Sequence, residues 1–188
     1  MSDDLELLGE ALPGYEIGGE IGRGGWGIVY DATHRRLGRR VAVKVLARHA
    51  GEDPTLREQF IEEARFVASL DHPHVVPVYD FVEHRGAFLI VMELLAGGTL
   101  WGRFHAQGIM SDEACAVTLA VCTALQMAHA QRRLHRDVKP ENVLYGRAGV
   151  VKLSDFGVAK VLGLGSGRHT EVVGTPVYMA PEHATGAV

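Results

Sequence analysis

The chain has 188 residues, enough for one domain or two small lobes with a sizeable core, but with no room for a separate accessory domain. Lys and Arg total 19 against 23 Asp and Glu, so the formal charge is −4, and no long basic run occurs. A nucleic-acid partner is therefore not expected. The densest basic cluster, Arg35, Arg36, Arg39 and Arg40, is interpreted as a solvated loop.

The amino-terminal half of the chain predicts mainly strands. Residues 1–14 are interpreted as an acidic lead-in, and they lack the basic start and apolar core of a signal peptide. Asp53 and Pro54 predict the start of a helix that ends near residue 70. Alternating apolar residues predict five strands, which span residues 15–21, 27–33, 40–46, 75–82 and 87–93. We therefore expect a five-stranded antiparallel sheet with one helix.

After residues 97–98, both Gly, the pattern becomes mainly helical. We expect a short helix over 99–106 and a long one that Ser111 caps. Residues 114–131 contain no Asp, Glu, Lys or Arg. This segment without charged residues is just long enough to span a membrane as a helix. Its Thr, Gln and His residues favour instead a buried helix packed on several sides. A short strand near 150–153 and a mobile loop over 158–173 follow.

Two cysteines, Cys115 and Cys122, share one face of the long predicted helix. Their Cα atoms would lie roughly 10 Å apart, too far for a disulfide. We interpret them as buried thiols in a reducing compartment, and we expect a cytoplasmic protein.

The stretch over residues 134–145 places an acid, an amine and an amide at fixed offsets. Asp137 can orient a hydroxyl and accept its proton, and Lys139 can reach a transferring phosphate. Asn142 offers a neutral oxygen suited to Mg²⁺. The alternative, a plain polar turn closed by Pro140, stays open unless the chain also supplies a nucleotide site.

A glycine-rich segment matches the pattern G-x-G-x-x-G-x-V at Gly22, Gly24, Gly27 and Val29. A dinucleotide fold would need a helix after the glycines, but Ile28 and Val29 predict a strand. A glycine hairpin lying over phosphates fits better, with Val29 above the adenine; an ordinary tight hairpin is the alternative.

Lys44 lies on the third predicted strand, where an ammonium aimed at phosphates needs a carboxylate partner. The following helix offers Glu62 and Glu63, and we choose Glu63 because Val67, one turn later, indicates the inward face. Asp155, followed by Phe156 and Gly157, can share Mg²⁺ with Asn142.

These segments, together with Ala180-Pro181-Glu182, occur in the order of the protein-kinase signature motifs. The chain resembles a eukaryotic-like serine/threonine protein kinase, and residues 71–76 and 174–179 look most like the bacterial branch. The resemblance implies an α+β, bilobal fold. Its amino-terminal lobe would be residues 15–95, and residues 96–188 would form part of a mainly helical second lobe.

The resemblance also implies ATP and Mg²⁺ as cofactors and a role for each matching residue. Asp137 would be the catalytic base, Lys139 would steady the γ-phosphate, and Asn142 and Asp155 would bind the metal. Met92 would be the gatekeeper. Val67, His135 and Phe156 would form part of the spine of the core. The implied ATP-binding residues are Ile21, Gly22, Gly24, Gly27, Val29, Ala42, Lys44, Glu63, Glu93, Leu95 and Leu144.

Regulation and partners are implied in the same way. A phosphate on Thr170, or less readily on Ser166, would pair with Arg136 and order the loop. The expected partners are protein substrates bearing Ser or Thr, which Lys139 and Thr175 indicate, and a kinase homodimer for autophosphorylation.

A family catalytic domain continues with several more helices after the A-P-E motif, so we expect a truncated domain that folds poorly alone. The main functional hypothesis is an ATP-dependent serine/threonine kinase. The alternative is a truncated, non-catalytic fragment that binds nucleotide or regulates a full-length kinase. A small-molecule phosphotransferase is disfavoured by Lys139 and the A-P-E segment.

Overall fold

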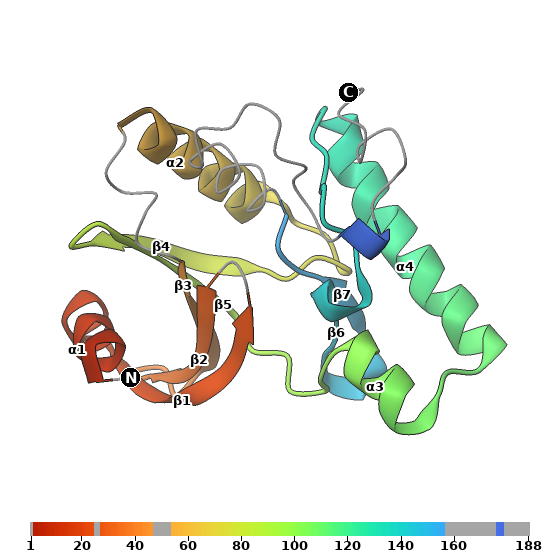
Figure 1. Ribbon diagram of the computed structural model, residues 1–188, viewed down its shortest axis with the longest axis horizontal. Coiled ribbons are helices and arrows are strands. Elements are labelled where there is room, and N and C mark those ends of the chain that lie inside the picture. Colours follow the sequence, from red (N-terminus) through yellow and green to blue (C-terminus); the bar gives the residue numbers. More distant parts are fainter. Residues whose placement is uncertain (1, 25–26, 47–53, 157–175, 179–188) are drawn as a thin grey trace. The chain divides into compact units, whose positions relative to one another are not determined.

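The computed structural model describes residues 2–24, 27–46, 54–156 and 176–178 (Figure 1). The chain divides into two compact units. The first comprises Met1–Ala68 and Pro77–Leu94, and the second comprises Ser69–Val76 and Leu95–Val188.

The first unit is built on one five-stranded antiparallel sheet with strand order β1-β2-β3-β5-β4. The strands are β1 (Tyr15–Gly24), β2 (Gly27–His34), β3 (Arg40–Leu46), β4 (Val78–His84) and β5 (Ala87–Glu93). Strand β4 begins three residues later than the sequence predicts. The reason is that Val75 and Val76 belong to the second unit, where Val75 forms a parallel bridge with Leu153.

Strand β3 is buried on both of its faces. Val41, Val43 and Val45 point to one face, where they belong to the main hydrophobic cluster. Ala42 and Lys44 alternate with them and therefore point to the opposite face. Both are buried as well, with exposures of 6% and 5%.

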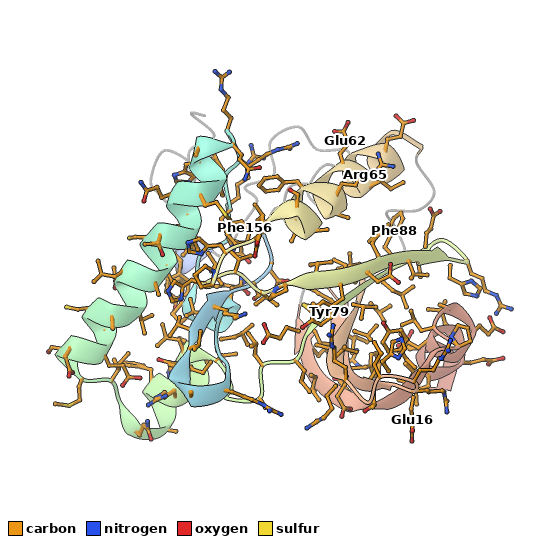
Figure 2. All side chains as sticks on the ribbon, turned by 180° about the vertical axis from the view of Figure 1, so that it is seen from behind. Glu16, Glu62, Arg65, Tyr79, Phe88 and Phe156 are labelled. Atoms are coloured by element: carbon orange, nitrogen blue, oxygen red, sulfur yellow. The ribbon has the colours of Figure 1, made fainter. Side chains whose placement is uncertain are left out.

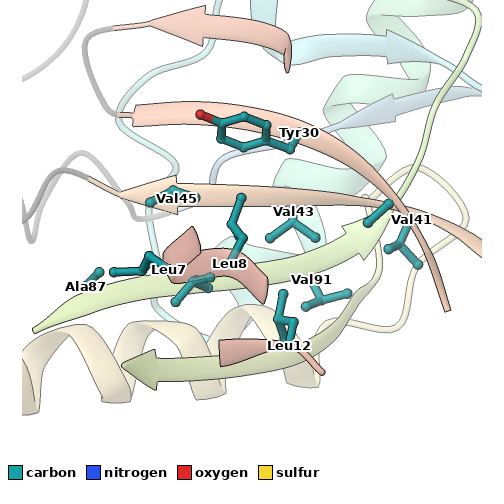
Figure 3. Close-up of a cluster of buried hydrophobic side chains, with 11 residues drawn as sticks. Leu7, Leu8, Leu12, Tyr30, Val41, Val43, Val45, Ala87 and Val91 are labelled. Atoms are coloured by element: carbon teal, nitrogen blue, oxygen red, sulfur yellow. The ribbon is translucent and has the colours of Figure 1, made fainter. Parts of the chain in front are cut away.

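A helix, α1 (Ser2–Ala11), precedes the sheet where we expected an acidic lead-in. Leu7, Leu8 and Leu12 of this segment are at most 4% exposed and pack into the hydrophobic cluster of the sheet (Figure 3). The acidic residues dominate the composition of this segment, whereas its leucines at helical spacing determine its structure. Helix α1 is therefore an addition to the predicted lobe of residues 15–95, in whose described part the sheet is accompanied by one helix, as the sequence predicts.

The second helix of the first unit is α2 (Pro54–Ser69). It agrees in length with the predicted helix, while the expected cap Asp53 lies outside the described residues. Glu62 and Arg65 are exposed on α2 (Figure 2).

The second unit combines two helices with a short hairpin. Helix α3 (Leu100–Gln107) begins after Thr99, whose Oγ1 accepts a hydrogen bond from the Gly102 N–H at 3.0 Å. Helix α4 (Ser111–Ala130) packs against β7. The hairpin pairs β6 (Val143–Tyr145) with β7 (Val151–Leu153), and β6 is a strand that we did not predict. Short 3-10 turns are η2 (Pro140–Asn142), η3 (Arg147–Gly149) and η4 (Pro176–Tyr178).

Helix α4 is less buried than we predicted. Its buried side consists of small residues at helical spacing, namely Val117, Ala120, Ala124 and Ala128. Cys115 and Cys122 are free thiols and both are exposed, so the prediction of buried thiols is wrong. They lie away from the stripe of small residues that packs on the unit. In the part of the chain that the structure describes, α4 alone is long and apolar enough to cross a membrane, which is weak evidence for a span.

Candidate active site

The loop between α4 and β6 brings three of the predicted site residues together. Lys139 Nζ lies 2.8 Å from Asp137 Oδ2. Asn142 Nδ2 donates to the Asp137 carbonyl at 2.7 Å and to Asp137 Oδ2 at 3.1 Å. The turn η2 returns the chain, and the Asn142 N–H donates to the Lys139 carbonyl at 3.0 Å. The carboxylate is thus held by an ammonium and an amide, and the Asp137 residue is only 5% exposed.

His135 fixes the start of this loop from inside the second unit. Its Nε2 donates to the Ser154 carbonyl at 2.8 Å, and its Nδ1 accepts from the Asp137 N–H at 3.2 Å. Burial lowers the pKa of His135, which favours the neutral ring that these two bonds require. The ring also meets Phe156 edge-on, with centroids 4.5 Å apart. His135 therefore connects the loop to the segment that follows β7.

Ser154 makes a second connection, which the sequence reasoning missed. Its N–H and its Oγ both donate to the Asn142 carbonyl, at 2.9 Å and 3.2 Å. The β6–β7 register pairs Val143 with Leu153, so Ser154 and Asp155 follow directly from the end of this hairpin. The three-residue strand β6 carries too little pattern to predict this pairing from sequence.

Asn142 and Asp155 supply the oxygen atoms expected for Mg²⁺. Since Asn142 Nδ2 donates to Asp137, its amide presents Oδ1 as the atom suited to a cation. Among the described residues, no group of three or more His, Cys, Asp or Glu could hold a metal. Mg²⁺ is commonly held by one or two protein ligands together with substrate phosphates, so the sharing of Mg²⁺ by Asn142 and Asp155 stays a prediction.

Arg136 has a left-handed backbone, with φ of 68°, and its side chain is exposed. This conformation lets both neighbours, His135 and Asp137, turn inward while Arg136 faces solvent. Thr170 and Ser166, the expected phosphorylation sites, lie outside the described residues, as do Gly157, Thr175 and the A-P-E segment. The pairing of Arg136 with a phosphate therefore stays a prediction.

In the first unit, the three signature glycines differ in what the fold requires of them. Gly27 has φ of +137°, and a Cβ added to it would lie 2.1 Å from the Val45 carbonyl oxygen. Among the described residues, a Cβ at Gly24 meets nothing within 4 Å, and one at Gly22 meets only Val29 Cβ at 3.9 Å. The hairpin itself therefore demands glycine at 27 but not at 22 or 24.

The predicted phosphate-binding lysine, Lys44, lies on β3 between Val29 of β2 and Ile90 of β5. Ala42 precedes it on the same face, Val29 is half-buried, and Ile21 is 51% exposed. The side chain of Glu63 is outside what the structure describes, so its pairing with Lys44 stays a prediction.

The remaining predicted adenine contacts are divided between the two units. Glu93 ends β5 in the first unit, and its N–H donates to the Pro77 carbonyl at 3.0 Å. Leu95 and Leu144 belong to the second unit, where Leu144 forms an antiparallel bridge with Thr99.

The backbone next to these residues is closely packed. The Gly97 N–H donates to the Tyr145 carbonyl at 2.9 Å, and a Cβ at Gly97 would lie 2.5 Å from that oxygen. Only glycine therefore fits at position 97.

A polar cluster that the sequence did not reveal ties α3 and α4 to β6. The Tyr145 hydroxyl donates to Glu113 Oε1 at 3.1 Å, and Arg103 Nε forms an ion pair with the same oxygen at 3.1 Å. The Arg103 guanidinium also lies 4.6 Å from the centre of the Tyr145 ring. Burial, followed by the hydrogen bond to Glu113, raises the pKa of Tyr145.

Comparison with known proteins places this geometry in a family. Residues 15–187 match the model of the protein kinase domain. The chain is 42% identical to serine/threonine-protein kinase PknA of Mycobacterium tuberculosis, over 95% of this chain and 43% of that protein. It is 37% identical to serine/threonine-protein kinase PrkC of Bacillus subtilis, over 97% of this chain and 28% of that protein. The chain thus spans less than half the length of these curated relatives.

The fold has solved counterparts as well. The crystal structure of a cysteine-to-alanine mutant of the Mycobacterium tuberculosis PknI kinase domain matches with a TM-score of 0.69 and 32% identity, covering 78% of this chain and 60% of that one. The match confirms the predicted α+β protein-kinase fold, with its five-stranded antiparallel sheet and partial helical lobe. The chain therefore belongs to the protein kinase family.

Proposed function

We propose that this chain transfers the γ-phosphoryl group of ATP to Ser or Thr hydroxyls of proteins, with Asp137 as the catalytic base. The observation that carries the proposal is the cluster in which Lys139 and Asn142 both contact Asp137 Oδ2, at 2.8 Å and 3.1 Å. A base must be held in one orientation to accept a proton from an incoming hydroxyl. The two contacts supply that restraint.

In the proposed step, the substrate hydroxyl oxygen bonds to the γ-phosphorus and the bond to the β-phosphate bridging oxygen breaks. The hydroxyl proton passes to Asp137, and ADP leaves with the electron pair of the broken bond. Lys139 is near enough to Asp137 to neutralise charge on the transferring group. The presence of a lysine at this position supports Ser/Thr rather than Tyr substrates.

Nucleotide binding would use the glycine hairpin and Lys44. Among the residues that the structure describes, no packing contact explains glycine at positions 22 and 24, whereas close approach of phosphate oxygens to the backbone would explain both. Lys44 would contact the α- and β-phosphates. Mg²⁺, which Asn142 and Asp155 would hold, neutralises phosphate charge when bound.

The direct test is transfer of labelled phosphate from Mg-ATP to a generic basic protein, with Asp137→Asn as the control variant. Asparagine retains an oxygen that can accept from Asn142 Nδ2, so the loop should stay folded while proton acceptance is lost. We expect label on Ser or Thr of the substrate with the wild-type chain and none with the variant. Nucleotide binding without any transfer would favour the alternative, a non-catalytic nucleotide-binding or regulatory kinase fragment.

A further inference from the structure

Helix α1 lies outside the region that matches the kinase family model, which begins at residue 15. It nevertheless belongs to the first compact unit and contacts β1 and β4. Leu8 is fully buried, and Leu7 and Leu12 are 4% and 3% exposed. These leucines make α1 part of the core of the unit.

Polar contacts fasten both ends of α1 to the sheet. Near its start, Asp4 Oδ2 accepts a hydrogen bond from the Tyr30 hydroxyl at 3.4 Å. Near its end, Glu10 Oε2 lies 3.1 Å from His84 Nε2 and 3.0 Å from Arg85 Nη1, at the turn between β4 and β5. A ten-residue helix has little stability alone, so it forms as a docked element of the sheet.

Helix α1 packs into the hydrophobic cluster on the face of the sheet opposite to the one that carries Ala42 and Lys44 of β3. Leu7 and Leu8 of α1, with Leu12 just after it, share one cluster with the valines of β3 (Figure 3). The intervening residues Ala42 and Lys44 point to the other face of the same strand. Because cores are close-packed and transmit strain, the packing of α1 fixes the backbone that carries Ala42 and Lys44.

We propose that α1 is a positioning element for nucleotide binding, and that Leu8 acts through β3 on the placement of Lys44. The inference rests on the proposed function, in which Lys44 contacts the phosphates of ATP. A helix that merely added stability would change the unfolding temperature without changing the ATP affinity of the folded protein. A positioning element changes both.

The experiment compares Leu8→Ala with Leu5→Ala in the full 188-residue chain. Both substitutions remove the same atoms from the same helix, but Leu5 is 39% exposed and Leu8 is fully buried. The dissociation constant of Mg-ATP is measured by titration, at a temperature where circular dichroism shows each variant to be folded. For Leu8→Ala we expect the dissociation constant of Mg-ATP to rise about tenfold, which is equivalent to ~1.4 kcal/mol of binding free energy. Leu5→Ala should bind as the wild type does, and Leu8→Met, which nearly conserves the volume, should restore most of the affinity.

If Leu8→Ala does not fold, Leu8→Val, which removes one methylene group, replaces it, with an expected rise of about threefold. Wild-type affinity in the folded Leu8 variant, despite a lower unfolding temperature, would overturn the inference and leave the proposed function intact. Failure of the folded wild-type chain to bind Mg-ATP would instead overturn the proposed function, and the inference with it.

Discussion

Replacement of Gly27 by alanine should destabilise the sheet more than the same change at Gly24. The added Cβ at position 27 would lie 2.1 Å from the Val45 carbonyl oxygen, where ordinary contacts begin at 3.4 Å, so strand backbone must move by more than 1 Å. The backbone φ of +137° at position 27 adds about 1–3 kcal/mol of strain when the residue is not glycine. Loss of a ladder hydrogen bond beside Leu46 adds about 1 kcal/mol.

The sum, about 2–4 kcal/mol, is a large share of the 5–15 kcal/mol that typically stabilises a domain. At Gly24 a Cβ meets nothing within 4 Å, so Gly24→Ala should stay within about 1 kcal/mol of the wild type. Urea denaturation followed by circular dichroism measures both. Equal midpoints for the two variants would show that the sheet does not require glycine at position 27. In the proposed function, Gly24→Ala should weaken Mg-ATP binding several-fold while leaving the midpoint nearly unchanged.

Three further changes test other parts of the structure. Lys139→Ala should lower kcat about 100-fold or more with the fold retained, because it removes the contact 2.8 Å from Asp137 Oδ2; an unaffected kcat in the transfer assay would contradict this. Acidification from about pH 7.5 to about pH 5.5 should lower the free energy of unfolding, because the unfolded chain protonates His135 near its ordinary pKa of 6.5 while burial keeps the folded ring neutral. His135→Phe should flatten that dependence in denaturation curves taken across this range. Gly9→Ala should stabilise the protein by about 0.5–1 kcal/mol, seen as a higher unfolding temperature, because the added Cβ on α1 meets nothing within 4 Å.

The sequence predicted those features that depend on periodicity or on ordered motifs. The alternation of Val41, Val43 and Val45 identified β3, and the offsets from Asp137 to Asn142 identified the loop whose side chains meet in the structure. Motif spacing was informative because a short loop closed by a proline turn leaves little freedom in where its side chains lie.

The features that sequence reasoning missed depend on tertiary contacts. Residues 1–14 were interpreted from their acidic composition alone, whereas α1 is stabilised by the sheet face that its leucines cover. The role of Ser154 depends on a hairpin of three-residue strands, which carries almost no pattern of its own. The exposure of Cys115 and Cys122 could not be predicted because composition gives the polarity of a helix but not which face packs.

A single-turnover experiment compares the wild-type chain with Asp137→Asn, both saturated with labelled Mg-ATP and given the same basic protein substrate. We expect equal nucleotide affinity, transfer of label to Ser or Thr by the wild type, and a rate at least about 100-fold lower for the variant. Equal transfer rates for the two chains would contradict the assignment of Asp137 as the base.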